Sequence, residues 1–185
     1  MGRKVALIVG SLRKESFNRK LALALQDMAP ESLTLTLVEI GALPLYNEDL
    51  DNDTPPQAWT VFRQEVNACE GVLFVTPEYN RSVPGVLKNA LDVGSRPYGK
   101  SVWAKKPAAI ASSTPGGLGA FGANHHLRQS MVFLDVPLLQ QPEIYLSQIN
   151  KAFDEQGKLK DDGIRKLLSG FMSAFAAWVD KHASD

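Results

Sequence analysis

The chain has 185 residues, in which 20 lysines and arginines balance 20 aspartates and glutamates, so its formal charge is zero. Nucleic-acid binding needs a basic excess to neutralise phosphates, so no nucleic-acid partner is expected. Hydrophobic residues make up 44% and charged residues 22% of the chain, which excludes long disorder and coiled coils. The length fits one domain, and we expect residues 1–185 to form it.

The cysteines and histidines are few and the apolar runs are short. These features exclude an internal disulfide, a metal site and a membrane span. Cys69 is the only cysteine and cannot form an internal disulfide, and the three histidines lack the spacing of a metal site, so no metal is expected. The apolar runs are shorter than the roughly 18 residues that span a membrane. The N-terminus does not resemble a secretion signal. These features indicate a cytoplasmic protein without a membrane span.

Strand-length apolar runs alternate along the chain with segments of helical period, which is the pattern of a parallel sheet covered by helices. Residues 4–9 form the first expected strand and residues 16–29 the first helix. Residues 33–38 alternate threonine with leucine and valine, as an edge strand does when one of its faces is wet.

The next expected helix starts at Thr54, as N-cap, with prolines in its first turn. Its spacing predicts that Val61, Phe62, Val66 and Cys69 share one face. We therefore expect Cys69 to be a core residue rather than a reactive thiol.

The second half of the chain continues the alternation. Residues 71–76 are apolar throughout, as suits a central strand that is buried on both faces. The later expected elements are a helix opened by Pro84 and ending at Val93, a strand at 107–112, a helix at 119–134, a short fifth strand at 136–139 and an amphipathic helix at 164–178. Five strands with crossover helices make a three-layer α/β sandwich.

In such sheets ligands bind outside the carboxyl ends of the strands, so the loops at residues 10–18, 77–83 and 113–119 are the places to look for chemistry. The first loop could hold a phosphate with backbone N–H groups, the positive end of a helix dipole and polar side chains. Those side chains are Ser11, Arg13, Ser16 and Asn18. Alternatively, Ser16 only caps the helix and Arg13 is a solvated surface charge, and spacing does not decide between the two interpretations.

The second loop contains two prolines that stiffen it, the flat ring of Tyr79 and the amide of Asn80. A planar heterocycle would lie well there. Alternatively, the loop is a rigid turn whose aromatic ring packs on the end of the sheet.

The third loop contains a literal Gly-x-Gly-x-x-Gly at Gly117, Gly119 and Gly122, with Glu143 21 residues farther on. This matches the dinucleotide-binding fingerprint, but that fingerprint belongs to the first β-α turn of a larger sheet, so we discount it. A glycine-rich loop also lets backbone approach the edge of a flavin closely.

Together these motifs resemble the NADPH-dependent FMN reductases of flavodoxin-like fold, and within them the bacterial NAD(P)H:quinone and chromate reductases. The resemblance rests on Gly10-Ser11-Leu12-Arg13 with Ser16 and Asn18, on Pro77-Glu78-Tyr79-Asn80, and on Ser112-Ser113 before the glycine run. It implies a five-stranded parallel sheet of strand order 2-1-3-4-5.

The resemblance also implies non-covalent FMN and a homodimer or homotetramer. The implied phosphate ligands are Ser11, Arg13, Ser16, Asn18 and the backbone of Phe17. The implied isoalloxazine contacts are Pro77, Glu78, Tyr79 and Asn80 on one side and Ser113, Gly116 and Gly117 on the other. Because FMN is anionic, we expect the carboxylates of Glu15 and Glu78 to face solvent or to pair with arginine or lysine.

The implied activity is hydride transfer from NADPH or NADH to FMN, followed by two-electron reduction of a small acceptor such as a quinone, chromate, or an azo or nitro compound. Because FMN carries the chemistry, no catalytic side chain is expected. The alternatives are a reductase that supplies reduced FMN to a monooxygenase, a flavodoxin-type electron carrier, which the neutral charge disfavours, and a flavin-free interaction domain. We expect His125 and His126 to lie on a helix surface, the alternative being contact with a substrate. We expect Trp103, Arg128 and Tyr145 to serve packing or subunit contact.

Overall fold

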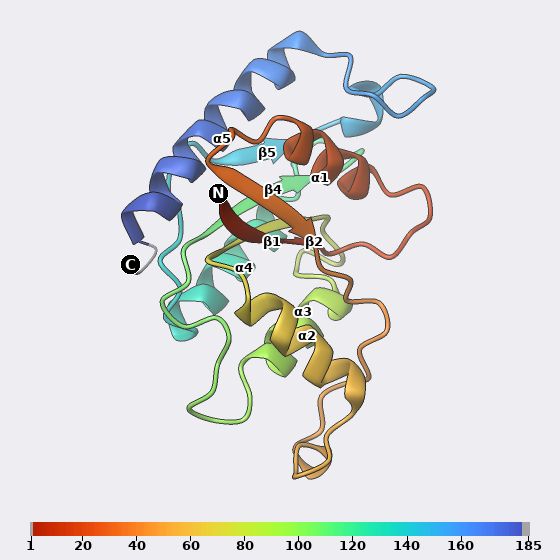
Figure 1. The fold of residues 1–185 in the computed structure, drawn as a ribbon. Coiled ribbons are helices and arrows are strands. Elements are labelled where there is room, and N and C mark those ends of the chain that lie inside the picture. Colours follow the sequence, from red (N-terminus) through yellow and green to blue (C-terminus); the bar gives the residue numbers. More distant parts are fainter. Residues whose placement is uncertain (1, 183–185) are drawn as a thin grey trace.

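Five parallel strands form a single twisted sheet with helices on both faces in the computed structural model, which describes residues 2–182 (Figure 1). The strand order is β2-β1-β3-β4-β5, which confirms the predicted topology. The strands are β1 (Arg3–Val9), β2 (Leu33–Leu37), β3 (Gly71–Thr76), β4 (Ala108–Ser113) and β5 (Ile144–Leu146).

The helices are divided between the two faces of the sheet. They are α1 (Phe17–Asp27), α2 (Gln57–Asn67), α3 (Gly85–Gly94), α4 (Phe121–Phe133) and α5 (Asp162–His182), with short 3-10 turns at Glu48–Leu50 and Ile149–Lys151. Figure 1 shows α1 and α5 on one side and α2, α3 and α4 on the other. Within the described residues, none of these helices has both the length and the apolar character needed to cross a membrane.

The alternation of side chains along each strand produces the two cores. In β1, Val5 and Leu7 pack with α1 and α5, whereas Ala6 and Ile8 pack with α2, α3 and α4. Every residue of β3 is buried, as predicted for a central strand. In β2 the threonines are exposed and Leu33 and Leu35 are buried, as predicted for an edge strand.

The predicted position of the fifth strand was wrong. Residues 136–139 make only an isolated bridge to β4, in which Ala108 N donates to Pro137 O and Leu139 N donates to Ala108 O. Pro137 has no N–H to extend the ladder, and the polar segment after Leu139 leaves the sheet. The strand forms instead at Ile144–Leu146, where Tyr145 lies opposite Ser112.

The predicted start of α2 was also wrong. The helix begins at Gln57 after Pro56, which adopts an extended conformation and provides no side-chain cap. The residue before a proline is disfavoured in the helical region, which excludes Thr54 and Pro55 from the first turn. Thr54 N instead donates to Asn52 Oδ1 at 2.9 Å.

One residue of the predicted buried face of α2 faces solvent. The side chain of Val61 is 43% exposed, because it lies at the edge of the apolar face that buries Phe62 and Val66. Cys69 is buried, as predicted, and burial raises the pKa of its thiol. A buried neutral thiol is unreactive, so Cys69 is a packing residue.

The close contact between Gly94 and Trp103 gives a test of the packing. A Cβ atom at position 94 would lie 2.5 Å from two ring carbons of Trp103, whereas a Cβ atom at Gly85 in the same helix would meet nothing within 4 Å. We expect Gly94→Ala to lower the free energy of unfolding by about 1–3 kcal/mol through overpacking. Gly85→Ala is the matched control and should leave it unchanged or slightly higher. Equal urea midpoints for the two variants would contradict this packing.

Candidate functional site

The carboxyl ends of β1, β3 and β4 lie next to one another, so the loops that follow them gather at one edge of the sheet. We call these loop 1 (residues 10–16), loop 2 (residues 77–84) and loop 3 (residues 114–120). Gly10 N donates to Val75 O at 2.9 Å, which carries the β1–β3 pairing into loop 1. A Cβ atom at Gly10 would lie 2.9 Å from Thr76 Oγ1, so this position needs glycine.

Loop 1 leads into the N-terminus of α1, where the first N–H groups have no partner within the helix. Ser16 is buried and is the N-cap, and its Oγ accepts from Arg19 N at 3.2 Å. Ser16 therefore does cap the helix, because its oxygen accepts a hydrogen bond from the first turn. Its hydroxyl hydrogen remains available to donate to another group. Arg13 is exposed, and no hydrogen bond or ion pair holds its side chain within residues 2–182.

Asn18 joins α1 to the end of β4. Its Nδ2 donates to Ser113 O at 3.2 Å, and Ser113 Oγ donates to its Oδ1 at 3.0 Å, with both side chains buried. The amide is thus turned toward Ser113, which leaves one N–H of Nδ2 for any anion in loop 1. Asn18 and Ser113, predicted for opposite ends of a cofactor, join the first turn of α1, just after loop 1, to the end of β4, just before loop 3.

Loop 2 is a tight two-residue hairpin. Tyr79 and Ser82 exchange two backbone hydrogen bonds, of 3.1 and 2.9 Å, around Asn80 and Arg81. Both central residues have positive φ, 50° and 64°, as a type I′ hairpin turn requires. Asn80 is exposed at the tip and the Tyr79 ring is 50% exposed. The loop therefore presents a flat aromatic surface and an amide, as predicted.

The two carboxylates near the loops are paired, as predicted. Glu15 Oε2 lies 3.3 Å from Lys20 Nζ. Glu78 Oε1 accepts from Arg81 Nη1 at 3.0 Å, and its Oε2 accepts from Ala123 N at 3.1 Å. Their charges are therefore compensated locally.

The glycines of loop 3 and α4 have two different roles. Gly119 has φ of 58°, and a Cβ atom there would lie 2.6 Å from the carbonyl carbon of Tyr145. A Cβ atom at Gly122 would lie 2.8 Å from Arg81 O. The chain's own packing thus requires two of the three fingerprint glycines, which supports discounting the dinucleotide motif. Gly116 and Gly117 are exposed and uncrowded, so they leave open space beside loop 3.

The start of α4 carries two exposed histidines with hydrogen-bond partners. His125 Nε2 lies 3.0 Å from Tyr145 Oη, and His126 Nδ1 lies 3.0 Å from Ser82 Oγ. Burial, reinforced by Glu143, raises the pKa of Tyr145 to about 12, so its phenol is neutral near pH 7. Both histidines lie on the helix surface, as predicted.

Trp103 and Arg128 serve packing, one of the two roles predicted for them. Trp103 is buried and its Nε1 donates to Leu91 O at 3.0 Å. Arg128 Nε donates to Asn124 Oδ1 at 2.9 Å.

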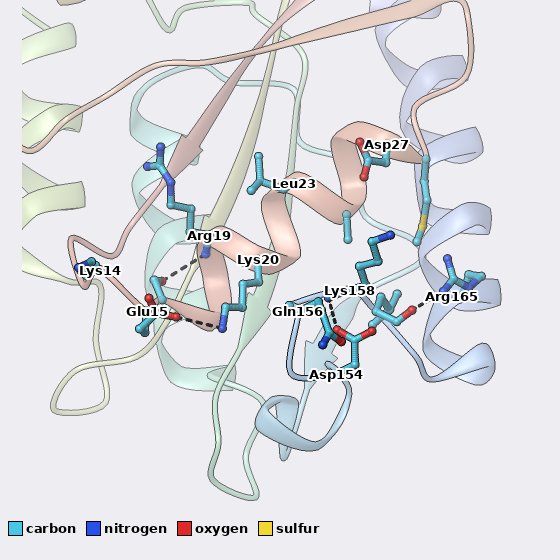
Figure 2. A pocket seen from close by; sticks show the side chains of 15 residues that line it. Lys14, Glu15, Arg19, Lys20, Leu23, Asp27, Asp154, Gln156, Lys158 and Arg165 are labelled. Atoms are coloured by element: carbon cyan, nitrogen blue, oxygen red, sulfur yellow. Dashed lines mark hydrogen bonds and ion pairs between the residues drawn. The ribbon is translucent and has the colours of Figure 1, made fainter.

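A cavity of about 840 Å³ lies beside loop 1, between α1 and residues 154–159 (Figure 2). Its charged side chains are the cations Lys14, Arg19, Lys20, Lys158 and Arg165 and the acids Glu15, Asp27 and Asp154. Figure 2 shows Lys158 and Arg165 across the cavity from α1. The cavity shares residues with loop 1 but with neither loop 2 nor loop 3. Three of its cations have acidic partners: Lys20 pairs with Glu15, Arg19 with Glu39 and Arg165 with Asp162.

Comparison with known proteins decides the family. The family model of the NADPH-dependent FMN reductases matches residues 3–151. The chain belongs to this family. It is therefore an FMN-dependent oxidoreductase that uses NAD(P)H, which confirms the enzyme and cofactor predictions.

Similar proteins cover nearly the whole length of this FMN reductase. A quinone reductase of Pseudomonas putida is 59% identical over 175 residues, which cover 95% of this chain and 94% of the relative. A 2-hydroxy-1,4-benzoquinone reductase of Burkholderia sp. is 48% identical over 179 residues, 97% of each chain. FerB, a flavoenzyme NAD(P)H:(acceptor) oxidoreductase from Paracoccus denitrificans, has a sequence 40% identical to this chain. Its structure superposes with a TM-score of 0.92 and covers 98% of this chain and 100% of that one.

The donors of loop 1 fit the phosphate of FMN. A helix N-terminus, the Ser11 and Ser16 hydroxyls and an unpaired arginine suit a dianion. The uncrowded glycines of loop 3 and the exposed Tyr79 ring suit a planar ring that lies over the sheet edge.

Two residues that shape the site, Arg81 and Ala123, were missed by sequence reasoning. The Asn-Arg pair in a two-residue turn is not one of the usual glycine-containing signals. The contact between Glu78 and α4 spans 45 residues of sequence, and local patterns do not report it.

Replacing Arg13 tests the phosphate site. We expect Arg13→Ala to weaken FMN binding by about 1.5–3 kcal/mol, because a charge-assisted hydrogen bond to the phosphate is lost. Lys14→Ala, which removes a neighbouring exposed cation, is the matched control and should cost much less. Fluorescence titration of the apoprotein with FMN measures both. Equal losses in the two variants would mean that Arg13 acts only through general charge.

Proposed function

We propose that this FMN reductase is an NAD(P)H:quinone oxidoreductase that reduces quinones or similar small acceptors, including chromate, azo and nitro compounds, by two electrons. The observation that carries this proposal is that relatives 59% and 48% identical over nearly their whole length are named as quinone reductases.

The geometry of the site supports a small acceptor. Tyr79, Asn80, Gly116 and Gly117 are all exposed, so a ring placed between loops 2 and 3 would present an open face to solvent. An open face admits flat molecules of different sizes. If NAD(P)H and the acceptor use the same face in turn, the kinetics will follow a ping-pong pattern.

The side chains of this site bind and orient, and none of them is needed as an acid or base. When bound, FMN supplies the chemistry, which is acceptance of a hydride from NAD(P)H and donation of two electrons to the acceptor. Ser11, Arg13, Ser16 and the backbone of Phe17 would hold its phosphate, and the free N–H of Asn18 would support them. Pro77, Glu78, Tyr79 and Asn80 would line one side of the ring, and Ser113, Gly116 and Gly117 the other.

Rapid mixing tests the proposed reaction. FMN-loaded protein mixed with NADPH or NADH should lose its flavin absorbance within milliseconds to seconds, and a benzoquinone should then restore it. The protein without added FMN is the control and should show neither change. No bleaching by either nucleotide would overturn the reductase activity. Bleaching without restoration by quinones would favour export of reduced FMN or an electron-carrier role.

We further propose that residues 1–185 act as one cytoplasmic domain that assembles into a homodimer or homotetramer. Exposed apolar side chains on α4 support assembly, since Val132 is 81% and Phe133 78% exposed. Adjacent large apolar groups on a surface favour contact with another protein.

Light scattering with size exclusion tests the assembly. The wild-type protein should elute at two or four times the 20.2 kDa chain mass. We expect Val132→Ser/Phe133→Ser to shift the population toward smaller species, because the apolar contact is lost. Leu45→Ser, which changes an exposed apolar side chain elsewhere on the surface, is the control. A wild-type protein that elutes as a monomer at micromolar concentration would contradict the proposal.

A further inference from the structure

Helix α4 begins without a cap of its own. Its N-cap residue, Ala120, has φ of 59° and no side-chain hydrogen bond to the first turn. The carboxylate of Glu78, which belongs to loop 2, accepts instead from Ala123 N at 3.1 Å. A carboxylate at this position satisfies an unpaired N–H and meets the positive end of the helix dipole. Glu78 thus caps α4 from another loop.

The same carboxylate holds the turn of loop 2. Arg81 has φ of 64°, a conformation that is unfavourable for residues other than glycine and asparagine. Glu78 Oε1 accepts from Arg81 Nη1 at 3.0 Å, and the Glu78 side chain is only 10% exposed. The Arg81 side chain is 72% exposed, so solvent screens the arginine end of this ion pair and the pair supports the unfavourable conformation of the turn only modestly.

Gly122 permits this double contact. A Cβ atom at Gly122 would lie 2.9 Å from Glu78 Oε2 and 2.8 Å from Arg81 O. Any side chain at this position would push loop 2 away from α4. His126 adds a second tie on the same side through Ser82 Oγ at 3.0 Å.

These contacts connect the two sides of the flavin site. Loop 2 carries Tyr79 and Asn80, and loop 3 runs directly into the first turn of α4. The distance between loops 2 and 3 therefore depends on how closely loop 2 packs against α4.

We propose that Glu78 is a positioning residue that fixes loop 2 against α4 and thereby sets how tightly FMN is held between loops 2 and 3. This rests on the flavin site proposed above. The carboxylate acts through Arg81 and Ala123 N, so its own charge does not need to meet the cofactor.

The test starts with Glu78→Gln, which keeps the size of the side chain and removes its charge. We expect the dissociation constant for FMN, measured by fluorescence titration, to rise about tenfold, because two charge-assisted hydrogen bonds are weakened. Glu31→Gln, at an exposed glutamate far from the loops, is the matched control and should bind FMN as the wild type does. Gly122→Ala should reproduce the loss, and combining it with Glu78→Gln should add little, because both break the same contact.

Rescue separates positioning from a general loss of stability. In Glu78→Gln the arginine keeps its unfavourable φ without its partner, whereas Arg81→Gly makes an Asn-Gly turn that adopts this conformation freely. We expect Glu78→Gln/Arg81→Gly to bind FMN at least twofold more tightly than Glu78→Gln does. The thermal midpoint of the apoprotein should differ little between these two variants.

Each outcome decides the proposal. If the wild type binds FMN and Glu78→Gln binds it equally well, the positioning role is overturned while the proposed function stands. If Glu78→Gln loses affinity in proportion to lost thermal stability and Arg81→Gly restores none, Glu78 is merely structural. If the wild type does not bind FMN, the proposed function fails first.

Discussion

The buried pair of hydrogen bonds between Asn18 and Ser113 is the contact around which the site is built. It joins the first turn of α1 to the last residue of β4, across the end of β1 and β3. Because both side chains are buried, losing one partner would leave a polar group unsatisfied, which costs more than an exposed hydrogen bond. The orientation of the α1 N-terminus relative to loop 3 follows from this pair, and with it the direction of the N–H groups that a phosphate would meet.

On the opposite side of the site, Glu78 makes the corresponding connection between loop 2 and α4. The helix that follows loop 1 is thus tied to the strand that precedes loop 3, and loop 2 is tied to the helix that follows loop 3. Three loops that are far apart in sequence are therefore held together as one frame. A frame of this kind is pre-organised, so less ordering is required when a ligand binds.

The sequence was informative wherever the signal was local or periodic. The fully apolar run of β3 and the alternation in β2 identified the central and edge strands, because burial on two faces or one leaves a direct pattern. Prediction from the sequence failed where contacts between distant segments determine the local structure. Residues 136–139 have the composition of a strand, but Pro137 limits their pairing to one bridge, and three later residues make the ladder. The turn at Asn80 and Arg81 and the capping of α4 depend on contacts that no local pattern contains.

The balance of charge in the whole chain and the charge near the site are different quantities. A net charge of zero disfavours docking on a strongly charged partner, but exposed charges more than about 8 Å from a bound phosphate are largely screened at physiological ionic strength. In loop 1 the nearby charges include Arg13, whose side chain has no ion pair among residues 2–182. The one carboxylate that enters loop 2, Glu78, is compensated by Arg81 and by the α4 N-terminus. A neutral chain can therefore offer an anionic cofactor a favourable site, since local pairing places its acids where the cofactor does not meet them.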